Sequence, residues 1–180
     1  MLDADAAQDV RRVADLRLRG RSGVMPVRVR WPSSATAEYS PPVMVFLPDA
    51  RAAGGVDAAD DELCHELCRR SGMVVLCAPW ALERAGRQCA DLDRAALVLD
   101  WCADHAWELG ADAETLVLAG RGAGAAAAVA LARRSVDRGW PRIAHQLLIV
   151  SDPPSAECEG RLRATRAEFV TEHELLERAA

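Results

Sequence analysis

Residues 115–134 read TLVLAGRGAGAAAAVALARR, in which an apolar segment, a glycine-rich turn and an alanine-rich segment follow one another directly. The apolar segment, residues 115–119, has the composition of a buried strand. The alanine-rich segment, residues 123–134, is predicted to be a helix, since alanine is the strongest helix former. A strand that turns directly into a helix is the repeating unit of a parallel sheet covered by helices. This stretch therefore predicts an α/β protein.

The rest of the chain repeats this alternation of strands and helices. A turn signal at residues 20–23 joins two neighbouring segments into a predicted antiparallel hairpin. The predicted strands are residues 14–19, 24–31, 43–47, 73–78, 115–119 and 143–150, and the predicted helices are residues 58–70, 91–109 and 123–134. We expect a three-layer α/β/α sandwich around a mostly parallel sheet. One domain is expected over residues 1–156, followed by a charged helical tail over residues 157–180.

The composition is that of a soluble globular protein. Of the 180 residues, 51% are hydrophobic and 27% are charged, which excludes an intrinsically disordered chain. The net charge of −5 argues against nucleic acid or an anionic membrane as a partner. The chain contains arginine but no lysine, and it is rich in alanine. This composition resembles the coding bias of a GC-rich bacterial genome. The acidic N-terminus carries no apolar signal segment, and we expect a cytoplasmic protein with no membrane span.

The glycine-rich turn matches two motifs. Its place between a strand and a helix is that of the G-x-S-x-G nucleophile elbow, where Gly122 occupies the serine position and offers no oxygen for attack. Its neighbours in the turn are Gly120, Arg121, Ala123 and Gly124. The same residues match the G-x-G-x-x-G/A dinucleotide fingerprint, but Asp152 lies beyond the acid spacing of about 20 residues. We expect no cofactor, although the helix N-terminus beside Arg121 is suited to a small anion.

Two further sets of reactive side chains carry alternative interpretations. Cys64 and Cys68 lie one helical turn apart, but zinc needs three or four ligands, so we interpret both as reduced thiols packed in the core. Ser151 and Asp152 end the last predicted strand, and His173 lies in the tail. Ser151 has no elbow around it and His173 stands between glutamates, so we expect neither a metal site nor a catalytic triad.

Several segments occur in the order and form of one known family. They are VRVRWP at residues 27–32, Trp101 and His105 before the turn, ELGAD at residues 108–112, DRG at residues 137–139 and IAHQLLI at residues 143–149. From about residue 14 to residue 150, the chain resembles the hormone-sensitive-lipase branch of the α/β-hydrolases. The resemblance implies a shortened α/β-hydrolase fold.

The same resemblance implies catalytic positions, and this chain departs from each of them. The family places H-G-G-G after its third strand, so that glycine N–H groups form an oxyanion hole. The matching residues here are Pro48, Asp49, Ala50 and Arg51. Asp49 is expected to bring a carboxylate to the oxyanion position, and Arg121 replaces the family's aspartate before the serine. The segment after Val150 is polar, and we expect it to lack the strands that carry the acid and the histidine.

These departures favour a degenerate lipase- or esterase-like α/β-hydrolase that is non-catalytic and serves as a binding or interaction module, or is a remnant. The alternative is a weak carboxylesterase with an unrecognised nucleophile, and a dinucleotide-binding protein is the third hypothesis. The last predicted strand begins at Ile143 and ends at Val150, and we expect it to be an exposed sheet edge unless the tail or another subunit covers it. A homodimer or a hetero-complex through that edge is the corresponding hypothesis.

Overall fold

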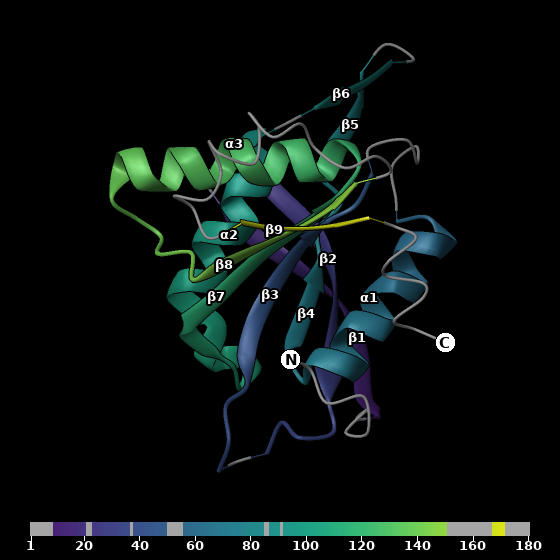
Figure 1. Cartoon of the computed structure of the whole chain (residues 1–180), viewed down its shortest axis with the longest axis vertical. Coiled ribbons are helices and arrows are strands. Elements are labelled where there is room, and N and C mark those ends of the chain that lie inside the picture. Colours follow the sequence, from purple (N-terminus) through teal and green to yellow (C-terminus); the bar gives the residue numbers. More distant parts are fainter. Residues whose placement is uncertain are drawn as a thin grey trace.

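The chain folds around a seven-stranded sheet of order β1-β2-β4-β3-β7-β8-β9 (Figure 1). This computed structural model describes residues 9–20, 23–36, 38–49, 56–84, 87–90, 92–150 and 167–171. The strands in spatial order are β1 (Val10–Gly20), β2 (Gly23–Pro32), β4 (Val74–Cys77), β3 (Pro42–Leu47), β7 (Asp112–Arg121), β8 (His145–Val150) and β9 (Ala167–Thr171). The first two pairings are antiparallel and the other four are parallel, which confirms the predicted mostly parallel sheet with an N-terminal hairpin.

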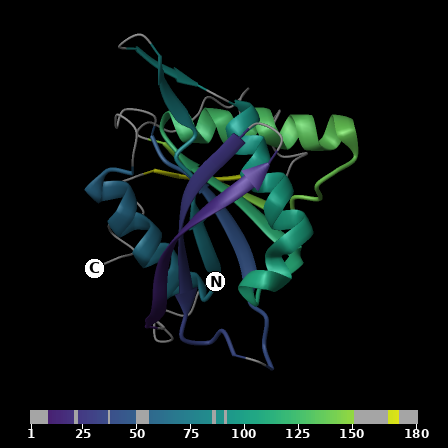
Figure 2. The ribbon, with the colours of Figure 1, turned by 180° about the vertical axis from the view of Figure 1, so that it is seen from behind.

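Helices cover both faces of the sheet and make the predicted three layers. Their bounds are α1 (Ala58–Ser71), α2 (Leu92–His105), η1 (Ala106–Leu109) and α3 (Ala123–Arg138). Alternate residues of a strand point to opposite faces. Accordingly, Val43, Val45 and Leu47 pack with residues of α2 and α3, whereas Met44 and Phe46 pack with residues of α1. The β1–β2 hairpin crosses the molecule in the view from behind (Figure 2).

Helix α1 is capped at both ends by side-chain and backbone groups next to it in the sequence. The Asp57 side chain accepts a hydrogen bond from the Asp60 N–H at 2.7 Å, which satisfies a donor of the first turn. The helix ends at Gly72, whose φ of 65° lies in the left-handed region that glycine adopts readily. These signals explain why the sequence predicts this helix to within one residue of its observed end.

The prediction for the tail after Val150 is wrong. The sequence predicts a helix and no further strand, but the described residues of the tail, Ala167–Thr171, form strand β9. Strand β9 pairs in parallel with β8, so the tail covers the strand that ends at Val150, and that strand is not an exposed sheet edge. The reason is that a strand of five residues within a charged segment has little pattern of its own, and its pairing with β8 supplies the missing stabilisation.

A second, two-stranded sheet is not expected from the sequence. Strands β5 (Ala81–Arg84) and β6 (Arg87–Ala90) form an antiparallel hairpin that projects from the main body in Figure 1.

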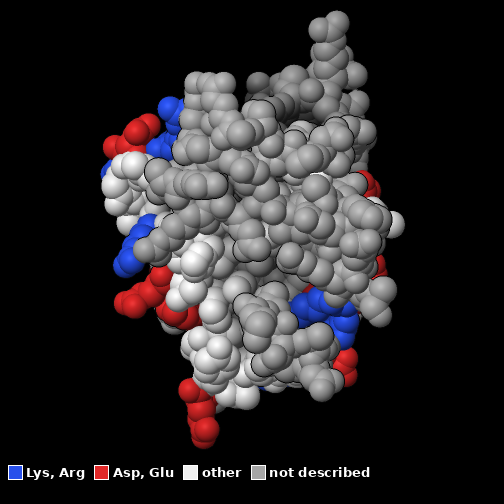
Figure 3. Space-filling model, in the orientation of Figure 1, with Lys and Arg blue, Asp and Glu red and all other residues white. Residues whose placement is uncertain are grey.

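No described helix is long and apolar enough to cross a membrane. Acidic and basic side chains both lie around the rim of the face in Figure 3, among residues that are not described.

Candidate functional site

The turn between β7 and α3 has the backbone of a nucleophile elbow without the nucleophile. Gly122 has φ 55° and ψ −119°, a conformation that glycine adopts without the strain that a side chain would meet. Its N–H donates to the Ile149 carbonyl oxygen at 3.1 Å, which ties the turn to the end of β8. The interpretation that Gly122 relieves a strained turn agrees with this geometry.

The other two glycines of the turn are explained by close packing. A Cβ on Gly120 would lie 2.3 Å from the Gly124 carbonyl oxygen, and a Cβ on Gly124 would lie 2.0 Å from the Leu47 carbonyl oxygen. Both distances are too short for carbon and oxygen. The first turn of α3 therefore rests directly on the end of β3, and the glycine pattern needs no bound cofactor to account for it.

The Asp49 carboxylate lies over the elbow. A Cβ built on Gly122 would be 2.8 Å from Asp49 Oδ2 and 2.9 Å from its Cγ. The Ala123 N–H donates to Asp49 Oδ1 across a long 3.4 Å. The carboxylate thus lies beside the elbow, where the sequence leads us to expect it. Pro48 is buried beside it, while Ala50 and Arg51 lie outside the described residues.

Arg121 turns away from the elbow toward the first turn of α1. Its Nε lies 2.9 Å from Asp60 Oδ1, and its Nη2 lies 3.6 Å from Asp57 Oδ2. This pairing, together with the Asp49 carboxylate at the start of α3, argues against the small-anion site suggested beside Arg121. A dinucleotide pyrophosphate would meet the Asp49 carboxylate at the same place, which argues against that hypothesis.

Asp60 is the most perturbed carboxyl group of this region. Its side chain is fully buried, and burial raises its pKa to about 6. The nearby Arg121 guanidinium opposes this rise, whereas the Asp57 carboxylate adds to it. A buried carboxyl group near several charges is a common feature of functional sites, but ion-pair networks perturb pKa values in the same way.

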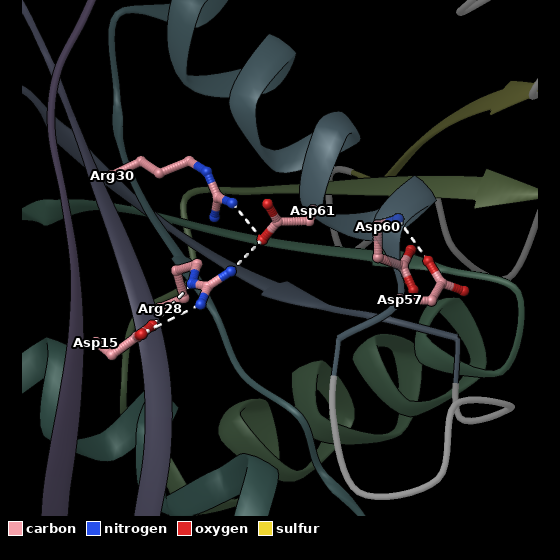
Figure 4. A network of polar contacts seen from close by, with 6 residues as sticks. All are labelled: Asp15, Arg28, Arg30, Asp57, Asp60 and Asp61. Carbon is pink, nitrogen blue, oxygen red and sulfur yellow. Dashed lines mark hydrogen bonds and ion pairs between the residues drawn. The ribbon is translucent and has the colours of Figure 1, made fainter.

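A second network holds α1 to the β1–β2 hairpin (Figure 4). Arg30 is almost fully buried and pairs with Asp61 at 2.5 Å, and Arg28 pairs with the same carboxylate at 3.1 Å. Arg28 also pairs with Asp15 at 2.7 Å. In Figure 4 the guanidinium groups of Arg28 and Arg30 point toward Asp61. Asp57 and Asp60 lie on the other side of Asp61, away from these two arginines. This network lies on the hairpin side of α1 and explains its docking to the sheet.

Neither His105 nor His145 lies at the elbow. His105 stacks on Trp101 with ring centroids 5.2 Å apart, and its Nδ1 lies 3.2 Å from the Trp101 carbonyl oxygen. His145 is exposed and begins β8, whereas the elbow lies at the carboxyl ends of the parallel strands. Ser151, Asp152 and His173 lie outside the described residues.

Four cysteines, Cys64, Cys68, Cys77 and Cys102, are free thiols buried in the core, as interpreted from the sequence. Cys64 and Cys68 face the sheet from α1 and have no exposed surface. Burial raises the pKa of the Cys64 thiol, with a further contribution from a hydrogen bond with Cys77, and burial raises the pKa of Cys68 to about 11. Among the described residues, no three histidine, cysteine or acidic side chains are arranged to hold a metal ion.

Comparison with known proteins decides the family. The profile of the alpha/beta hydrolase fold matches residues 51–180. The chain belongs to this family. The matched region extends through the tail, beyond the range expected from the sequence, in agreement with the presence of β9.

The related proteins are esterases by name. Esterase LipI of Mycobacterium tuberculosis is 28% identical over 137 residues, which is 76% of this chain and 43% of that protein. Carboxylesterase NlhH of the same species is 27% identical over 124 residues, covering 69% of this chain and 38% of that protein. This chain thus spans less than half the length of these relatives.

Solved structures of the family give the same result. An esterase from Pyrobaculum calidifontis superimposes with a TM-score of 0.67 at 27% identity, covering 83% of this chain and 50% of that chain. Esterase LipW of Mycobacterium marinum has a TM-score of 0.61 at 30% identity, covering 83% and 48% respectively. The fold and the esterase- and lipase-like ancestry expected from the sequence are therefore confirmed.

The pairing of Arg121 with α1 is not expected from the sequence, which presents Asp57 and Asp60 only as acidic residues that favour the start of a helix. The sequence does carry a signal for this pairing. Arg121 ends β7, and α1 follows β3, which is the neighbour of β7, so both lie at the same edge of the sheet. That signal becomes usable only once β3 and β7 are known to be neighbours.

Proposed function

We propose that this protein is a non-catalytic member of the alpha/beta hydrolase fold family that serves as a binding or interaction module. The observation that carries the proposal is Gly122, which stands in the elbow conformation with no side-chain oxygen. Covalent catalysis by the family's serine chemistry begins with that oxygen. Its removal from a serine hydrolase costs roughly 10⁶ in turnover.

The charge around the elbow supports the same conclusion. Acyl transfer needs hydrogen-bond donors aimed at the oxygen that becomes negative in the transition state. Here the Ala123 N–H already faces the Asp49 carboxylate. A negative group at that place would raise the energy of a developing oxyanion, so the surroundings of the elbow oppose the reaction as well.

A weak carboxylesterase with another nucleophile is the second candidate. It is favoured by the relatives LipI and NlhH, which are an esterase and a carboxylesterase. In that case the substrate class is carboxylic esters. The nucleophile would have to lie outside the elbow, because Gly122 cannot supply it.

A fluorophosphonate probe separates these two candidates. We expect no labelling of the wild-type protein, with a fluorophosphonate-sensitive serine esterase as positive control and heat-denatured protein as background. Short-chain p-nitrophenyl esters should be hydrolysed by the wild-type protein, Gly122→Ser and Asp49→Gly/Gly122→Ser at the rate of buffer alone. Labelling or turnover by folded wild-type protein would refute the non-catalytic function and favour the carboxylesterase.

An interaction role implies a partner. We propose self-association or a hetero-complex, formed through a surface other than β8, since β9 covers that strand. Light scattering at increasing protein concentration tests self-association. A mass equal to one chain at all concentrations would remove the homodimer.

A further inference from the structure

The Asp49 side chain stands where an elbow of this family holds reacting oxygen atoms. The backbone N–H that follows the nucleophile is one of the two oxyanion-hole donors. In this chain that donor belongs to Ala123 and faces Asp49 Oδ1 at 3.4 Å. The second carboxylate oxygen lies 2.8 Å from the place of a Cβ on residue 122, where a serine side chain would begin. The Asp49 carboxylate therefore occupies both the place of the oxyanion and the place of the missing serine side chain.

The backbone on which Asp49 is mounted is held from two sides. The Leu47 carbonyl oxygen lies against Gly124 so closely that no Cβ fits between them. The Trp80 indole N–H donates to the Pro48 carbonyl oxygen at 3.0 Å, and the Trp80 side chain is buried. Because both preceding residues are fixed, the Asp49 side chain is directed to the elbow by the end of β3.

We propose that Asp49 is an intramolecular occupant of the oxyanion position, which excludes carbonyl and anionic ligands from the elbow. The inference rests on the proposed function, because only a site without a nucleophile can keep its own carboxylate there. Like charges repel, and the neighbouring Asp57 and Asp60 add to the negative potential. Arg121 pairs with both carboxylates and carries one positive charge against their two, so it offsets this repulsion only in part.

The test compares two variants that each lose one carboxylate. Asp49→Ala removes the occupant, whereas Glu114→Ala removes an exposed carboxylate at the opposite end of β7. Methylphosphonate is titrated into ¹⁵N-labelled wild-type protein and both variants at constant ionic strength, and the Ala123 and Gly122 amide signals are followed. We expect saturable shifts in Asp49→Ala, with an affinity for methylphosphonate at least about tenfold above that of the other two proteins.

Equal shifts in all three proteins, or none in Asp49→Ala, would overturn the inference. Hydrogen exchange provides a readout that needs no ligand. The Ala123 amide should exchange faster in Asp49→Ala than in wild-type protein, whereas its rate in Glu114→Ala should be unchanged. An unchanged Ala123 rate in a folded Asp49→Ala protein would also refute the inference. These measurements detect binding and not turnover, so their failure is distinct from labelling by the fluorophosphonate probe.

Discussion

The buried Asp60 should make folding stability depend on pH in a direction opposite to that of its neighbour Asp61. The pKa of Asp60 rises from 3.8 to about 6 in the folded protein, chiefly because burial disfavours the charged carboxylate. The folded state therefore holds this proton more tightly than the unfolded state. The stabilisation is complete below pH 4 and is lost as the pH rises to about 6. A difference of about two pKa units corresponds to about 3 kcal/mol.

The assay is urea unfolding followed by tryptophan fluorescence from pH 4 to pH 7.5 at constant salt. Asp60→Asn should remove the dependence, so the free energy of unfolding of wild-type protein should fall relative to this variant by up to about 3 kcal/mol across that range. Because an asparagine side chain cannot ionise, the difference between the two proteins isolates one group. Parallel stability curves for the two proteins would refute the reasoning.

Asp61→Asn is the matched control on the same helical turn. Burial tends to raise the pKa of Asp61, but hydrogen bonds from Arg30 and Arg28 lower it below its usual value. Its contribution is therefore present at neutral pH and is lost only as the pH falls below about 4. Wild-type protein and Asp61→Asn should show a constant difference from pH 5 to pH 7.5. If the difference in free energy of unfolding fell with pH as it does for Asp60→Asn, the pH dependence would belong to the whole helical turn and not to Asp60.

Two further predictions concern packing. Gly124→Ala should unfold the protein or lower its melting temperature by more than about 10 °C, because its Cβ would lie 2.0 Å from the Leu47 carbonyl oxygen. Gly139→Ala is the control, because its Cβ meets nothing within 4 Å. It should lower the free energy of unfolding by only about 1 kcal/mol, since alanine is strained at a φ of 70°. Equal losses of stability in the two variants would contradict this account. Cys64 and Cys102 are fully buried, so iodoacetamide should label them in urea and not in buffer, as read by peptide mass spectrometry.

Much of the fold could be predicted because its signals are local. The apolar segment before Gly120 and the alanine-rich segment after it carry strand and helix propensity within a few residues. Asp57 and Gly72 mark the ends of α1 by capping chemistry that depends only on neighbouring backbone groups. The family resemblance added the α/β-hydrolase fold with its N-terminal antiparallel hairpin and mostly parallel sheet, and the family match and the sheet confirm both.

The errors arise where stabilisation comes from distant residues. Strand β9 has five residues between charged neighbours, and its hydrogen bonds are made with β8. The β5–β6 hairpin is equally short, at four residues per strand. Propensity over so few residues is weak, and tertiary pairing overrides it.

The residue types alone reveal an α/β-hydrolase elbow without a nucleophile, because Gly122 lacks a side-chain oxygen in any conformation. It also indicated that a carboxylate replaces the oxyanion-loop glycine. What these changes do together depends on which strands lie side by side in the folded sheet. The parallel pairing of β3 with β7 brings Asp49 to Ala123, which lies 74 residues farther along the chain, and sends Arg121 to Asp60 on α1. Contacts between the ends of neighbouring strands depend on strand order, and strand order is a property of the folded sheet.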